Sequence, residues 1–162
     1  MPVVEKSADT IELFISYSHK DEDLRKELEN HLSALRHSKD ITGWHDRCIG
    51  AGQEWAGEID AHLNSADIIL LLISSDFLAS KYCYEIEMQR AMERHQAGEA
   101  RVIPVILRPV DWTGVPFEKL QALPKEGKPV LKWDNRDEAF LDVARGIREV
   151  VKALRSGVAP ES

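Results

Sequence analysis

The residues best suited to chemistry lie in one stretch, residues 74–91, where an apolar strand gives way to a helix. Positions 68–73 are all Ile or Leu, and a serine-rich turn follows them. The helix after that turn carries two acidic residues, Glu85 and Glu87, in its first turns. In open α/β sheets, ligands bind where strands end and helices begin. The pattern therefore predicts carboxyl groups at the mouth of a site, with Glu87 as the main candidate for chemistry.

Strands and helices that alternate along the chain are expected to position this stretch. Runs rich in apolar and β-branched residues predict strands at 11–17, 41–45, 66–74, 101–107 and 130–133. Apolar residues at helical spacing predict helices at 21–36, around 55–63, at 80–98 and at 135–154. Such alternation implies a parallel sheet with helices on both faces. The expected fold class is therefore α/β, a single flavodoxin-like domain whose five-stranded parallel sheet has the order 2-1-3-4-5.

The predicted strand order places the ends of two strands beside each other. Its switch point lies between strands 1 and 3, so the loops at 16–20 and 74–81 should border one crevice. Residues expected around that crevice are Ser16, Tyr17, Ser18, Ser74, Ser75 and the start of the third helix. The segment 46–54 contains two glycines and no periodicity, which predicts a loop at the same edge.

Composition narrows the class of protein. The 162 residues suffice for one domain, and a net charge of −7 argues against nonspecific binding to nucleic acid or to an anionic membrane surface. The longest apolar run is too short to span a bilayer, and the first residues lack a signal-peptide pattern. Two cysteines without zinc-site spacing favour a reducing, cytoplasmic location and no metal. We expect a flexible N-terminus at 1–10, the domain at 11–154, and a linker or tail at 155–162.

Three spaced motifs resemble those of Toll/interleukin-1 receptor (TIR) domains. Residues 14–22 resemble the first box of that family, residues 46–55 its second box, the BB loop, and residues 74–91 its third strand and following helix. The resemblance covers residues 11–154, and the segment 101–109 looks more like bacterial members than animal receptors.

The resemblance implies an activity and a catalytic residue. Many TIR domains cleave NAD⁺ between nicotinamide and ribose, using a glutamate that lies three residues after a cysteine. Here that position is Ile86, and acidic residues flank it. The family glutamate is followed four residues later by a small residue, which Ala91 matches for Glu87. Glu87 is therefore the predicted catalytic residue, and Glu85 stays open as the alternative.

Cleavage of NAD⁺ at this bond requires few catalytic groups from the protein. Nicotinamide departs as a neutral molecule, so no general acid is needed, and one carboxylate can stabilise the oxocarbenium-like ribose. Water attack gives ADP-ribose and internal attack gives a cyclic product, and the sequence leaves both open. No Gly-x-Gly-x-x-Gly follows the first strand, so NAD⁺ is expected as a substrate, with no bound cofactor.

The resemblance and the crevice together suggest further contacts with the substrate. The positions predicted to bind it are Ser16, Tyr17, Ser18, Asp46, Arg47, Trp55 and Tyr82. Tyr82 is expected to stack on the cationic nicotinamide ring, and Arg47 offers a fork of donors to a diphosphate. Asp46, Arg47 and Trp55 are alternatively expected to contact a neighbouring subunit.

The expected function is NAD⁺ cleavage by an enzyme that self-association activates, in bacterial immune signalling and antiviral defence. Two other functions are alternatives to it. The first is a non-catalytic TIR adaptor that forms homo-oligomers or filaments through the loop at 46–55. In that case Glu87 is an ordinary helical acid, which in isolation would be expected at the surface. The second is a phosphoacceptor receiver, disfavoured because strand 1 ends in Ser-Tyr-Ser instead of an acidic pair, with only Asp76 and Lys132 as partial matches.

Overall fold

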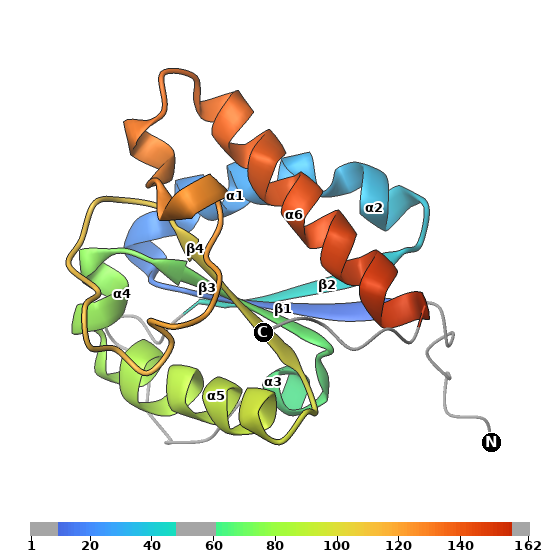
Figure 1. Cartoon of the computed structure of the whole chain (residues 1–162), viewed down its shortest axis with the longest axis horizontal. Coiled ribbons are helices and arrows are strands. Elements are labelled where there is room, and N and C mark those ends of the chain that lie inside the picture. Colours follow the sequence, from blue (N-terminus) through green and yellow to red (C-terminus); the bar gives the residue numbers. More distant parts are fainter. Residues whose placement is uncertain (1–9, 48–60, 157–162) are drawn as a thin grey trace.

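A parallel β-sheet lies between two layers of helices in the computed structural model of the chain (Figure 1). The structure describes residues 10–47 and 61–156. Its sheet has four strands in the order β2-β1-β3-β4. The strands are β1 (Ile11–Tyr17), β2 (Ile41–Arg47), β3 (Ile68–Ile73) and β4 (Arg101–Ile106). This confirms the α/β class and the predicted order of the first four strands.

The helices lie on both faces of this sheet. On one face lie α1 (Glu22–His31), α2 (Ser33–His37) and α6 (Arg136–Ser156). On the other face lie α3 (Ala61–Ser65), α4 (Ser75–Ala79), the π-helix η2 (Lys81–Met88) and α5 (Gln89–Gln96). Short 3-10 turns complete the fold: η1 (His19–Asp21), η3 (Lys125–Gly127) and η4 (Val130–Lys132).

Alternating side chains of the strands supply two separate hydrophobic cores. In β1, Leu13, Ile15 and Tyr17 face the layer of α1 and α6, whereas Phe14 faces the layer of η2 and α5. All six residues of β3 are buried, because this central strand is covered on both faces. Burying one such side chain stabilises the fold by about 1.5–3 kcal/mol, so the two cores fix the strand ends firmly.

The predicted fifth strand at 130–133 is wrong for the described chain, because η4 occupies that position as a 3-10 turn. A proline precedes η4, and proline cannot donate to a β-ladder. Leu123 pairs with Val105 in an isolated parallel bridge, and the N–H of Leu131 donates to the carbonyl of Leu107 at 3.1 Å. Isolated contacts thus cover the outer edge of β4 where a strand was expected.

Several predicted helix ends are confirmed. The hydroxyl of Ser80 accepts from the N–H of Cys83 at 3.1 Å, so Ser80 caps η2. Gly98 follows α5 with a φ of 76°, a left-handed conformation that glycine adopts without strain. Asn135 caps α6 by accepting from the N–H of Glu138 at 3.1 Å. The helix predicted over 21–36 is instead divided at Leu32 into α1 and α2.

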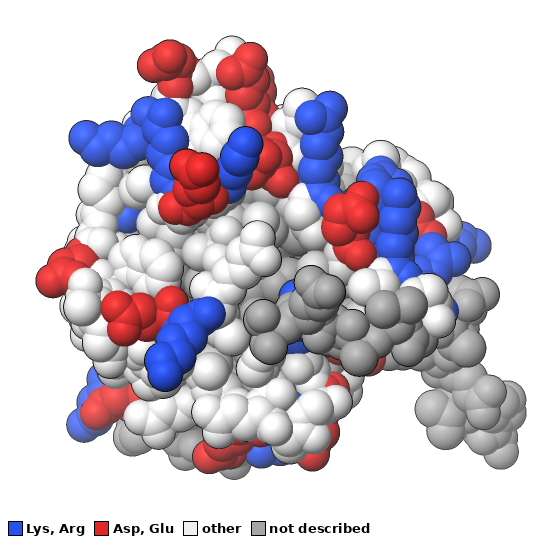
Figure 2. Space-filling view, viewed as in Figure 1, with Lys and Arg blue, Asp and Glu red and all other residues white. Residues whose placement is uncertain are grey.

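The surface drawn in Figure 2 carries acidic and basic side chains interspersed over α6 and the segment before it. This face shows no continuous basic stripe among the atoms that the figure colours. Within 10–47 and 61–156, no helix combines the length and apolar character needed to cross a membrane.

Candidate functional site

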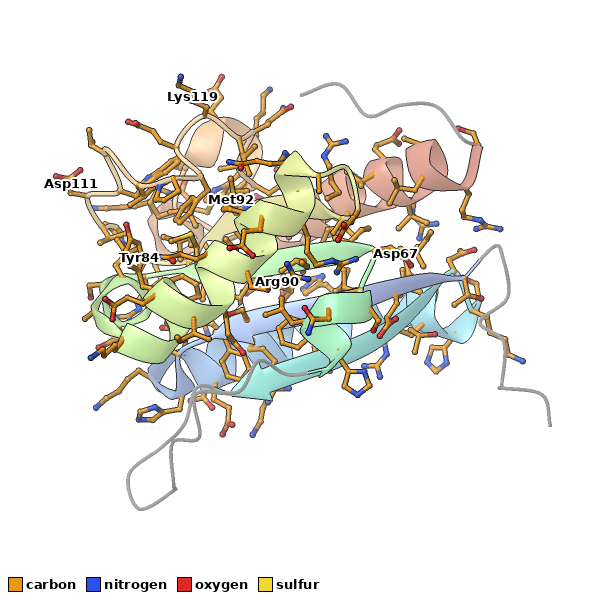
Figure 3. All side chains as sticks on the ribbon, turned by 90° about the horizontal axis from the view of Figure 1, so that it is seen from below. Asp67, Tyr84, Arg90, Met92, Asp111 and Lys119 are labelled. Carbon is orange, nitrogen blue, oxygen red and sulfur yellow. The ribbon has the colours of Figure 1, made fainter. Side chains whose placement is uncertain are left out.

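The site lies where β1 and β3 end side by side, at the carboxyl edge of the sheet. These two strands pair directly, with Ser16 of β1 opposite Leu71 of β3. The chain leaves β3 into α4 and then η2, which packs back against β1. Figure 3 shows η2 and α5 lying across this face, with Tyr84 near one end and Arg90 further along. The predicted switch point is therefore where helical side chains meet β1.

Glu87 of η2 reaches across to Ser16 of β1. The Ser16 hydroxyl donates to Oε1 of Glu87 at 2.6 Å, and both residues are 0% exposed. A buried carboxyl is costly unless hydrogen bonds compensate it, so this contact is a specific feature of the fold. Glu85, the alternative acid, is exposed. The structure thus brings Glu87 to the predicted crevice and leaves Glu85 in solvent.

The π-helical form of η2 explains the unusual spacing between Cys83 and Glu87. A π-helix closes its hydrogen bonds from residue i to i+5, so each closed turn holds one more residue than an α-helical turn. Cys83, Glu87 and Ala91 are all fully buried along this segment and α5. The extra residue is therefore absorbed within the helix while Glu87 stays on the buried face.

A second polar cluster lies at the same edge of the sheet, and Ser74 is its one member that the sequence placed there. Arg108, just after β4, donates through Nε to Asp21 at 2.8 Å and through Nη2 to Asp76 at 2.6 Å. The Ser74 hydroxyl donates to the other carboxylate oxygen of Asp21. Burial opposes the charge of Arg108, but the hydrogen bonds to Asp76 and Asp21 outweigh it and raise the Arg108 pKa.

Among the described residues, no group of three or more His, Cys, Asp or Glu side chains is arranged to hold a metal ion. At the carboxyl edge, the Ser16 hydroxyl donates to Glu87, and Arg108 and Ser74 donate to Asp21.

Comparison with known proteins identifies the family. The TIR domain family matches residues 13–141, most of the chain and both strands of the site. The chain belongs to the TIR domain family. This confirms the resemblance drawn from the three motifs.

One relative and one solved structure are similar to this chain. An uncharacterized protein of Sinorhizobium fredii (strain NBRC 101917 / NGR234), y4lF, is 56% identical over 149 residues, which cover 91% of this chain and 46% of that protein. The chain thus spans less than half the length of that relative. The TIR domains of the activated Roq1 resistosome, which directly recognises the pathogen effector XopQ, align over 90% of this chain and 78% of theirs, with 18% identity and a TM-score of 0.46. That likeness is too low to carry an argument.

The TIR domain does not bring all residues of its first predicted motif together. Tyr17 is buried in the opposite core, where the Arg25 guanidinium lies 5.2 Å from the centre of its ring. Ser18 caps η1 by accepting from the N–H of Lys20 at 3.2 Å. Of the three predicted residues, the hydroxyl of Ser16 is the one hydrogen-bonded to Glu87. Roles of Tyr17 and Ser18 in binding substrate stay predictions.

The second TIR motif lies partly within a strand. The backbones of Asp46 and Arg47 belong to β2, where they pair with Ser16 and Tyr17. The predicted loop start at Asp46 is therefore wrong, because the β1–β2 ladder continues through Arg47. Trp55 lies outside the described residues. Tyr82 lies in η2, and its predicted stacking role stays a prediction.

Proposed function

We propose that this TIR domain cleaves NAD⁺ at the bond between nicotinamide and ribose, with Glu87 as the catalytic residue. One observation carries the proposal: the Glu87 carboxyl lies against Ser16 at the switch point of the sheet, 2.6 Å from its hydroxyl. In open α/β folds this crevice is where ligands bind. The position would thus offer a carboxylate and a hydroxyl to a ribose.

In this reaction the C–N bond to nicotinamide breaks with both electrons going to the pyridinium nitrogen, which becomes neutral. The positive charge develops on the ribose, where an ionised Glu87 would stabilise it and hydrogen-bond the ribose hydroxyls. Water then adds to the ribose and releases a proton, so the products are nicotinamide, ADP-ribose and H⁺. Attack by another part of the same nucleotide would give cyclic ADP-ribose instead.

The burial of Glu87 bears on regulation. With an exposure of 0%, the Glu87 side chain cannot touch a substrate in the described conformation. We therefore propose that this conformation is the resting state and that TIR–TIR self-association, through residues 46–55, opens the site. The identity to a Sinorhizobium fredii protein favours a bacterial setting, and a role in bacterial immune signalling is part of the proposal.

The same burial supports a second candidate, a non-catalytic TIR adaptor. A fully buried glutamate hydrogen-bonded to a neighbouring strand can serve packing alone. In that case Glu87 would stabilise the domain, and assembly would occur without any turnover of NAD⁺.

Nicotinamide release measured by chromatography over a wide range of protein concentration separates these candidates. The enzyme proposal predicts release that rises more steeply than the protein concentration, because assembly opens the site. Product identification then decides between linear and cyclic ADP-ribose. If no nicotinamide is released at concentrations where light scattering shows assembly, the enzyme proposal is contradicted and the non-catalytic adaptor is supported.

A further inference from the structure

We infer that Arg108 is a positioning residue. Together with Asp21, Asp76 and Ser74 it holds Glu87 in place against Ser16. These four residues come from three segments that follow β1, β3 and β4. One guanidinium joins all three segments through two ion pairs, of 2.8 Å to Asp21 and 2.6 Å to Asp76. We call these four residues the edge clamp.

Hydrogen bonds and ion pairs among its own side chains hold the edge clamp together. The Asp21 side chain is 1% exposed, and its two oxygens are taken by Arg108 and by the Ser74 hydroxyl. The Ser74 hydroxyl also accepts from the N–H of Phe77 at 3.2 Å, so the clamp includes the N-cap of α4. Each contact fixes a main-chain segment in addition to a side chain.

Charge argues against a ligand site in the clamp itself. Two carboxylates and one guanidinium leave a formal charge of −1, which repels a phosphate or carboxylate ligand. The Arg108 side chain is only 28% exposed, and its Nε and Nη2 are already bonded to the two aspartates. The cluster is thus suited to holding loops together and unsuited to binding an anion.

The clamp spans the same elements as the candidate site. Asp21 follows β1, which carries Ser16, and Asp76 lies in α4, which leads into η2 and Glu87. Loss of the guanidinium would leave the buried Asp21 without its cation and free the loops after β1 and β3 to shift. Because small displacements of a catalytic group cost large factors in rate, a shift of about 1 Å at Glu87 would cost roughly 100-fold.

The test compares Arg108→Gln, Asp76→Asn and Arg136→Gln. Arg136 is the matched control, since its Nε donates to Glu27 at 2.8 Å in an exposed pair between α6 and α1. Asp76→Asn removes the negative charge from one arm of the clamp and keeps the buried Asp21–Arg108 pair, so it tests the clamp if Arg108→Gln fails to fold. Arg108→Lys is the conservative variant for partial rescue.

Two readouts keep this inference separate from the proposed function, on which its catalytic part rests. Hydrogen–deuterium exchange tests positioning directly: Arg108→Gln and Asp76→Asn should speed exchange in η2 by at least about tenfold, and Arg136→Gln should not. If wild type releases nicotinamide, the same two variants should lower kcat by roughly 10- to 100-fold with KM little changed, and Arg108→Lys should recover part of it. Exchange in η2 equal to wild type in both clamp variants would overturn the inference, whether or not NAD⁺ is cleaved.

Discussion

Ser16 and Glu87 form a buried hydrogen bond of 2.6 Å that joins β1 to the π-helix η2 across 71 positions of sequence. Both side chains are fully removed from solvent. The contact fixes which acid of the segment 74–91 meets the sheet, and it places that acid at the switch point. It also explains why a helical glutamate, ordinarily a surface residue, is buried here.

Ser16→Ala tests that contact. The variant removes a donor from a buried carboxyl, so it should lower the free energy of unfolding by about 1–3 kcal/mol. It should also slow NAD⁺ cleavage, because the orientation of Glu87 is less restricted. Denaturant unfolding and nicotinamide release measure the two effects.

Ser33→Ala is the control for that variant, since the Ser33 hydroxyl makes a long 3.4 Å contact to the carbonyl of Glu29 in the helical layer on the opposite face. It should leave both quantities close to wild type. If the two alanine variants behaved alike, the Ser16–Glu87 contact would have no special role.

A register change in η2 tests the role of the π-helix. Deleting the exposed Glu85 restores three-residue spacing between Cys83 and the glutamate, so the segment should become α-helical with Glu87 still facing Ser16. We expect the deletion to keep NAD⁺ cleavage within about tenfold of wild type, and an alanine inserted after Glu85 to lower it roughly 100-fold.

Nicotinamide release, with amide exchange across η2, follows both register variants. Equal loss of activity in the deletion and the insertion would show that the π-helix does not serve to absorb one extra residue.

The pH dependence of stability should contain a contribution from His95. Burial, with the nearby charge of Arg101, lowers the pKa of His95, whose Nδ1 accepts from the N–H of Val102 at 3.1 Å. Below about pH 6.5 the unfolded chain takes up a proton that the folded imidazole does not. The free energy of unfolding should therefore fall as the pH drops below that value, until the lowered pKa of the folded state is reached.

His95→Asn keeps an acceptor near Val102 but does not titrate in this range. Its unfolding free energy, measured in denaturant at several pH values between about 5 and 8, should depend less on pH than that of wild type. The exposed His37→Asn serves as the comparison and should retain the wild-type slope. A slope unchanged by His95→Asn would contradict this assignment.

The strands of the sheet were predictable because their signals are local. The β-rich run of β1 gives its bounds directly, the apolar run of β3 lies within the predicted range 66–74, and alternation with helices gives the strand order. The same alternation also separates Ser16 from Tyr17, since neighbouring residues of a strand face opposite sides. Ser16 and Tyr17 therefore face opposite sides of the sheet instead of one common crevice.

Other features depend wholly or partly on contacts between residues far apart in the sequence. The segment 130–133 is apolar enough for a strand, but the proline before it and the single bridge at Leu123 leave a 3-10 turn. Asp21 and Arg108 are 87 positions apart, and each alone resembles an ordinary surface charge. The π-helix left one trace in the sequence: Glu87 lies four positions after Cys83, one more than the three-position spacing of the family motif.

The central claim is that Glu87 acts on NAD⁺, and the matched pair Glu87→Gln and Glu85→Gln tests it most directly. Both substitutions replace a carboxyl group by an amide in the same helical segment, but only Glu87 lies at the site. Nicotinamide release should fall at least about 100-fold in Glu87→Gln, as when one preorganised electrostatic group is removed from an active site, and stay near wild type in Glu85→Gln. Equal rates of release in folded Glu87→Gln and wild type would contradict the account.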